Sequence, residues 1–243
     1  DEAALRDAVA LAQRGDDAGP GGRLLLGWHG LAVGPSKELL TEKNLAAVLE
    51  AFGYAPDGEA VGDLADALRQ LSGGGTVGNL TGAFLAAERH GFGRSLGAFI
   101  ADALLAQFLG WRHAVPLMGT EVVSGVGMGR SRQSPLATIG HDGVERTKSL
   151  LAAQARAALR AIDLFGDLGR RADKLLAVAP KLRAKGAGAI VDRLLNEDAL
   201  VASRGAQNNG MSDRGLRRLF DRLVELGAVR ELSGRPTFRI YGL

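Results

Sequence analysis

MSDRGLRRLFDRLVELGAVRELSGRPTFRIYGL, residues 211–243, is the stretch that decides the fold at the C-terminal end of this chain. Ser212 is a good N-cap, and Asp213 places a negative charge in the first turn, where it complements the helix dipole. Gly227 is a stop signal for a helix. The stretch therefore predicts a helix that begins after Ser212 and ends before Gly227.

The predicted helix has two chemically different faces. At about 100° per residue, its large apolar residues fall in one sector and its arginines in the opposite one. The apolar sector contains Leu216, Leu219, Phe220, Leu223 and Leu226, and the cationic sector contains Arg214, Arg217, Arg218 and Arg222. We expect the first face to lie against a core and the second to face solvent.

Two short strands are predicted after this helix. Residues 228–232 and 237–241 are joined by Ser-Gly-Arg-Pro, residues 233–236, which is typical of a four-residue hairpin loop. Arg235 is expected at the tip of this loop, and Arg239 on the second strand. Before the arginine-bearing helix, residues 187–195 predict another helix, and residues 198–203 a weaker helical patch.

The order helix, helix, arginine helix and hairpin is typical of a winged helix-turn-helix. Guanidinium groups bind phosphates and pair with guanine edges in the major groove, and a wing arginine enters a narrow minor groove. We therefore predict that the chain binds duplex DNA. The predicted contacts are Arg214, Arg217, Arg218, Arg222, Arg235 and Arg239. An alternative interpretation is an ordinary solvated face, partly neutralised by Asp213, Asp221 and Glu225.

The remainder of the chain predicts a multi-helix domain over residues 1–180, followed by the winged-helix-like module at 181–243. Hydrophobic residues make up 46% of the sequence and aromatic residues only 5%, which favours a mainly α fold. Ser36 is expected to be the N-cap of the helix at residues 37–52. The predicted helices cover residues 1–14, 23–33, 37–52, 61–71, 79–89, 95–109 and 144–179.

Positive charge is concentrated in the predicted module. From Lys181 onward there are 12 Lys and Arg against 7 Asp and Glu, whereas the first 180 residues have 18 against 20. The formal net charges are thus +5 and −2. This distribution places the cations where a nucleic-acid contact needs them.

Several function classes are excluded or not indicated. The chain has no cysteine, which rules out disulfides, thiolate nucleophiles and cysteine zinc sites and fits a cytoplasmic protein. No apolar run has the length of a membrane span. The four histidines lack a ligand partner four residues away, so no metal or cofactor is predicted. A glycine-rich loop at 125–129 lacks the Lys-Ser/Thr of a P-loop, and Glu121 has no obvious partner. We therefore expect no enzymatic activity.

Five blocks of sequence resemble DUF1403, a bacterial family known only as a domain of unknown function. The blocks are DEAALRDAVAL, GDDAGPGGRLLLGWHGLA, WRHAVPLM, LLAVAPKLRAKGAG and the C-terminal stretch quoted above. Members usually carry a further N-terminal stretch, so the resemblance implies a truncated start. The C-terminal stretch is also similar to the C-terminal winged helices of bacterial regulators and of Fic-type proteins. DUF1403 has no established activity, so the family resemblance implies the domain layout and not a reaction.

Two other functions remain open from the sequence. The helical domain or the module could dock a protein partner or a second copy of the chain, giving a homo-oligomer without nucleic-acid binding. An enzyme that uses the Gly-, Ser- and Arg-rich stretch 124–143 is a further alternative. Salt-dependent binding of duplex DNA distinguishes the leading hypothesis from both.

Overall fold

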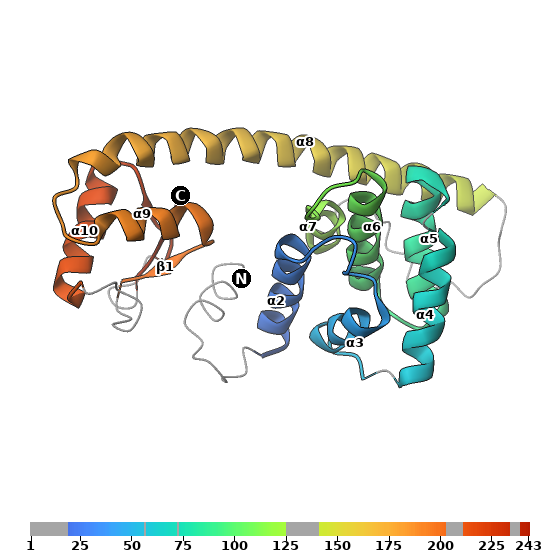
Figure 1. Ribbon diagram of the computed structural model, residues 1–243. Coiled ribbons are helices and arrows are strands. Elements are labelled where there is room, and N and C mark those ends of the chain that lie inside the picture. Colours follow the sequence, from blue (N-terminus) through green and yellow to red (C-terminus); the bar gives the residue numbers. More distant parts are fainter. Residues whose placement is uncertain (1–18, 56, 72, 125–140, 203–210, 234–238) are drawn as a thin grey trace. The chain divides into compact units, whose positions relative to one another are not determined.

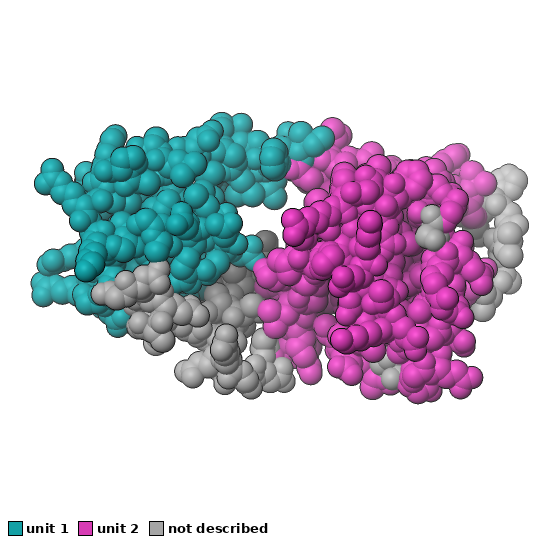
Figure 2. All heavy atoms as spheres, viewed as in Figure 1, with its two compact units in different colours: residues 1–18, 162–243 teal, residues 19–161 magenta. Residues whose placement is uncertain are grey.

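The computed structural model describes residues 19–55, 57–71, 73–124, 141–202, 211–233 and 239–243. The chain divides into two compact units (Figures 1 and 2). We call residues 19–161 the helical unit and residues 162–243 the C-terminal unit. Helix α8, His141–Val178, begins in the helical unit and ends in the C-terminal unit. The predicted mainly α fold with a short C-terminal hairpin is confirmed.

The helical unit is built from helices that the apolar periodicity largely predicted. The predictions at 23–33, 61–71, 79–89 and 95–109 correspond to four observed helices, and α7 was not predicted. The helices before α8 are α2 Gly19–Val33, α3 Glu42–Ala51, α4 Gly58–Leu71, α5 Gly75–Arg89, α6 Arg94–Phe108 and α7 Leu117–Ser124. The predicted helix at 1–14 lies outside the described residues.

Helix α6 is the centre of this unit because it is apolar on nearly all sides. It contacts α2, α5 and α7, and most of its side chains from Leu96 to Ala106 are buried. Gly97 is required for the close approach of α5: a Cβ there would lie 2.8 Å from Cδ1 of Phe84. The packing of α5 on α6 therefore depends on the absence of a side chain at Gly97.

Ser36 does not cap a helix, and this prediction was wrong. The chain forms successive turns before α3, which begins at Glu42. Ser36 is buried, its hydroxyl donates to the carbonyl of Trp111, and its N–H donates to the carbonyl of Arg112 at 2.8 Å. A contact with a segment far away in the sequence has replaced the local cap, because both groups need partners once they are buried.

The C-terminal unit packs helices against a small sheet. After α8 come the 3₁₀ turn η1 Ala179–Lys181, α9 Ala187–Asn196, β1 Leu200–Val201, α10 Asp213–Glu225, β2 Arg230–Glu231 and β3 Ile240–Gly242. Its core joins Leu175 and Val178 of α8 to the buried faces of α9 and α10. Packing thus extends to residues before Lys181, and the predicted boundary at 180/181 stays a prediction.

The sheet is antiparallel, with β3 between β1 and β2. Glu231 of β2 pairs with Tyr241 of β3, and Leu200 of β1 pairs with Tyr241 on the other side. The helical patch predicted at 198–203 is therefore wrong where the structure describes it, since Leu200 and Val201 form a strand. The free edge of β3 supplies hydrogen-bond partners that a short, isolated helical segment would lack.

Candidate nucleic-acid interface

Helix α10 begins and ends where its capping residues predicted. The Ser212 hydroxyl accepts a hydrogen bond from the Gly215 N–H at 3.2 Å. At the other end, Gly227 has φ +62°, and its N–H donates to Val224 at 2.8 Å. The next N–H, of Ala228, donates to Leu223 at 2.9 Å. These two bonds form a Schellman motif, which turns the chain sharply into β2.

The apolar face of α10 lies in the core of the C-terminal unit. Leu216, Leu219, Phe220 and Leu223 are buried, and they belong to one cluster with α9 and the end of α8. Phe220 also stacks on Tyr241 of β3, with 4.3 Å between ring centroids. The rotation of α10 about its axis is therefore fixed by packing on both helices and sheet, and the opposite face is directed outward.

The arginines of α10 lie on that outward face. Arg214, Arg217 and Arg218 are exposed, and within the part of the chain that the structure describes none forms a hydrogen bond or ion pair. Arg222 is also exposed, but its Nη1 lies 2.7 Å from the Glu225 carboxylate. The positive charge is thus polarised along the helix, with three unpaired cations in its N-terminal half and a neutralised pair near its C-terminal end.

Of the two arginines predicted for the wing, the structure describes only Arg239. Arg235 lies outside the described residues. Arg239 is exposed one residue before β3, and its Nη1 lies 3.6 Å from the Glu231 carboxylate. A hydrogen bond to the Tyr241 hydroxyl and the charge of Glu231 raise the pKa of Arg239. Arg239 therefore remains charged and is held at the hairpin by partners of its own chain.

Glu121 has partners that its sequence position did not reveal. Its side chain on α7 is 0% exposed and forms ion pairs with Arg156, at 3.2 Å, and with Arg160. Both arginines lie on α8, four residues apart, and both are roughly half exposed. The sequence offered no obvious mate for this carboxylate, and the structure supplies two arginines. The cluster attaches α8 to α7 within the helical unit and compensates a buried negative charge.

Asp102 is a second buried carboxylate that sequence reasoning missed. It lies on α6 and accepts hydrogen bonds from the N–H groups of Met118, at 2.9 Å, and Gly119, at 3.3 Å. Burial raises the pKa of Asp102 to about 8, although these backbone bonds act in the opposite direction. The side chain caps the N-terminus of α7, which is a structural role. An acidic residue inside the apolar run LGAFIADALL was the available signal.

Other types of site find little support in the described residues. Nowhere in ranges 19–55, 57–71, 73–124, 141–202, 211–233 and 239–243 do three His, Cys, Asp or Glu side chains form a group that could hold a metal ion. Within the same ranges, no helix combines the length and the apolar character needed to cross a bilayer. The glycine-rich loop at 125–129 lies outside the described residues.

These features define a mainly α protein with a small C-terminal helix-and-sheet unit whose outer helix bears exposed arginines. Residues 1–243 match the model of the family described as Protein of unknown function (DUF1403). The chain therefore belongs to the DUF1403 family, as the resemblance of the five sequence blocks implied. No curated protein and no solved structure matches it.

Proposed function

We propose that this protein is a non-enzymatic, cytoplasmic DNA-binding protein, and that the outer face of α10 contacts duplex DNA. The observation that carries the proposal is the set of three exposed arginines, Arg214, Arg217 and Arg218, that have no partner among the described residues. Ion pairing within the chain has not used these charges. A polyanion can bind them without first breaking internal salt bridges.

The arrangement of elements supports the same proposal. Helix α10 packs on a three-stranded antiparallel sheet and is followed directly by the β2–β3 hairpin, which is the order found in winged helices. A single helix fits the major groove of B-DNA, and residues near its N-terminal end are those that reach base edges in helix-turn-helix proteins. The three unpaired arginines lie in that half of α10.

The arginines differ in the roles that we assign to them. Arg214 and Arg218 are one turn apart on the same row, so they suit neighbouring phosphates along one strand. Arg217 lies on the adjacent row and is assigned to the groove side. Arg222 and Arg239 are secondary contacts, because each first has to leave a carboxylate of its own chain. Arg235 is assigned to the minor groove as a wing contact.

The test is fluorescence anisotropy of a labelled DNA duplex over a salt series from about 50 to about 200 mM. Replacing both Arg214 and Arg218 by Ala should reduce the slope of log K against log salt by about two, because the two phosphate contacts assigned to them are lost. The matched control replaces Arg89 and Arg94 by Ala. These residues are exposed in the helical unit, and the control removes the same charge.

An equal loss of affinity in both double variants would mean that net charge alone drives binding, and it would overturn the assignment to α10. Absence of measurable binding at the lowest salt concentration would also overturn it, and would favour a protein-interaction role. Circular dichroism of each variant shows whether the fold has been kept.

A further inference from the structure

The middle of α8 exposes large apolar side chains in the C-terminal unit. Ile162 is 67% exposed and Phe165 is 81% exposed, and neither belongs to a core cluster. Leu164, on the other side of the same stretch, is 58% exposed, and burial of α8 against α9 and α10 begins further along the helix, at Leu175 and Val178. Exposed aliphatic and aromatic side chains at successive turns are unfavourable in water and mark an interaction surface.

The same face of α8 has unusually little bulk between its apolar side chains. Gly166 and Gly169 lie within 60° of Ile162 on a helical projection, and glycine inside a helix weakens it. Among the described residues, a Cβ at Gly169 would meet no atom within 4 Å, and one at Gly166 would meet only the Arg170 guanidinium at 3.6 Å. The described packing therefore does not require either glycine.

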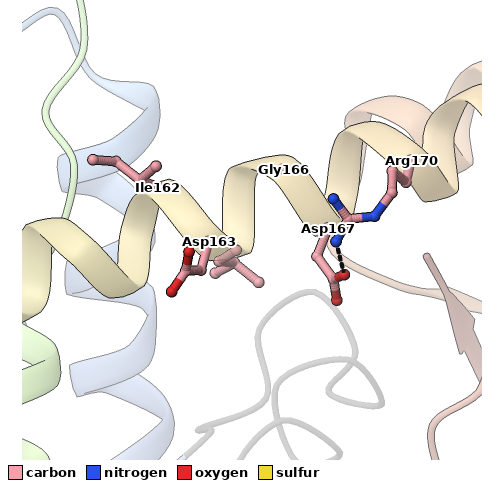
Figure 3. A pocket seen from close by; sticks show the side chains of 6 residues that line it. Ile162, Asp163, Gly166, Asp167 and Arg170 are labelled. Atoms are coloured by element: carbon pink, nitrogen blue, oxygen red, sulfur yellow. Dashed lines mark hydrogen bonds and ion pairs between the residues drawn. The ribbon is translucent and has the colours of Figure 1, made fainter.

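A pocket lies beside this stretch of α8 (Figure 3), and its described lining consists of Ile162, Asp163, Leu164, Gly166, Asp167 and Arg170. Asp163 is exposed and has no ion pair within the described ranges, whereas Arg170 forms a bridge of 2.7 Å with Asp167. Asp163 and Arg170 lie two turns apart on one edge of the face. The face thus combines an apolar centre with an acidic and a basic group at the two ends of one edge.

The charge pattern is complementary to itself when two copies run antiparallel. If the two-fold axis passes between Asp167 and Leu168, Gly166 lies opposite Gly169 of the partner subunit. Asp163 then lies beside the partner's Arg170, and the symmetry repeats this pair on the other side. In a parallel two-fold arrangement this edge of the two copies would lie on opposite sides of the contact, so Asp163 and Arg170 would form no pair between the subunits. The charge pattern therefore favours a second copy in antiparallel orientation as the binding partner of this face.

We propose that residues 162–170 of α8 bind the same residues of a second copy in antiparallel orientation, which makes the protein a homodimer. Ile162 and Phe165 lose their exposure in this dimer, the glycines let the two helices approach closely, and the Asp163–Arg170 pairs set the register. The proposal does not depend on DNA binding, and its experiment contains no DNA.

Sedimentation equilibrium of the full chain tests the proposal through charge reversal. The unmodified protein should be dimeric at micromolar concentration. Asp163→Arg or Arg170→Asp alone should weaken the dimer about tenfold or more, because each places like charges at both symmetric pairs. The double variant Asp163→Arg with Arg170→Asp should recover most of the affinity. Glu50→Arg, an exposed reversal on α3, is the matched control and should have no effect.

Disulfide trapping gives an independent readout, because the chain has no cysteine of its own. Gly169→Cys lies close to the proposed two-fold axis, so mild oxidation should link two chains covalently, whereas Glu50→Cys should leave them monomeric on a denaturing gel. A monomeric unmodified protein would overturn the proposal, as would a dimer that the single reversals leave unchanged. If the unmodified protein is a monomer and Ile162→Glu lowers its melting temperature, another segment of the same chain covers this face, and the dimer proposal is overturned.

Discussion

Phe220 of α10 and Tyr241 of β3 stack with their ring centroids 4.3 Å apart and their planes 11° from parallel. Phe220 is fully buried, and Tyr241 is the residue of β3 that pairs with both neighbouring strands. This contact joins the arginine-bearing helix to the middle of the sheet. The direction of the arginine face thus depends on an aromatic pair on the other side of the helix.

Phe220→Ala should destabilise the protein by about 3 to 5 kcal/mol, because it removes a large buried side chain and leaves a cavity. Urea denaturation followed by circular dichroism measures this change. Tyr241→Phe keeps the stacked ring and loses only the hydroxyl bonded to Arg239, so it should cost about 1 kcal/mol. Similar losses in the two variants would show that ring packing is not the main contribution.

Glu225→Gln should increase the affinity for duplex DNA about two- to fivefold at low salt. The carboxylate of Glu225 holds Arg222 at 2.7 Å, and its removal leaves this cation available while deleting a negative charge from the outer face. Anisotropy titrations measure the change, with Glu50→Gln as a control for net charge. Unchanged or weaker binding would contradict a role for the C-terminal end of α10.

Gly97→Ala should destabilise the helical unit by about 1 to 3 kcal/mol, since its Cβ would overlap Phe84 of α5. Gly62→Ala is the matched substitution inside α4, where an added Cβ would meet no described atom within 4 Å. It should stabilise the protein by about 0.5 to 1 kcal/mol through higher helix propensity. Thermal denaturation of the two variants should therefore give shifts of opposite sign, and shifts of the same sign would contradict the tight α5–α6 contact.

Asp102 should make the protein less stable as the pH rises from about 4 to about 8. Burial raises the pKa of Asp102 from 3.8 to about 8, so the folded state holds a proton in this range that the unfolded state has released. The stability of Asp102→Asn relative to the unmodified chain should therefore increase with pH across that window. Denaturation of both chains at each pH cancels the other titrating groups, and a constant difference would refute this expectation.

Local signals predicted the helices well because their causes lie within a few residues. The cap at Ser212, the stop at Gly227 and the apolar period between them all act within one or two turns, and the observed α10 has those limits. The two predicted features that failed, Ser36 as a cap and a helical patch at 198–203, both depended on distant partners. Trp111 binds Ser36, and β3 pairs with Leu200 and Val201.

The ion pairs also divide into those that nearby sequence predicts and those that only the packed structure reveals. Nothing near Glu121 in sequence indicates that Arg156 and Arg160 will reach it, because they come from a helix more than thirty residues later. Pairing between Arg222 and Glu225 was foreseeable, since residues three apart are neighbours on a helix. Only the packed structure separates Arg222 from the three arginines that have no partner among the described residues.

By itself the sequence determined a mainly α chain, the limits and two-sided character of the arginine helix, and the hairpin after it, since periodicity and capping are local properties. Tertiary structure decided which strand completes the sheet, how buried Asp102 and Glu121 are compensated, and which face of α8 remains exposed. These outcomes depend on groups far apart in the chain, which have to satisfy each other's hydrogen bonds and charges once water is excluded.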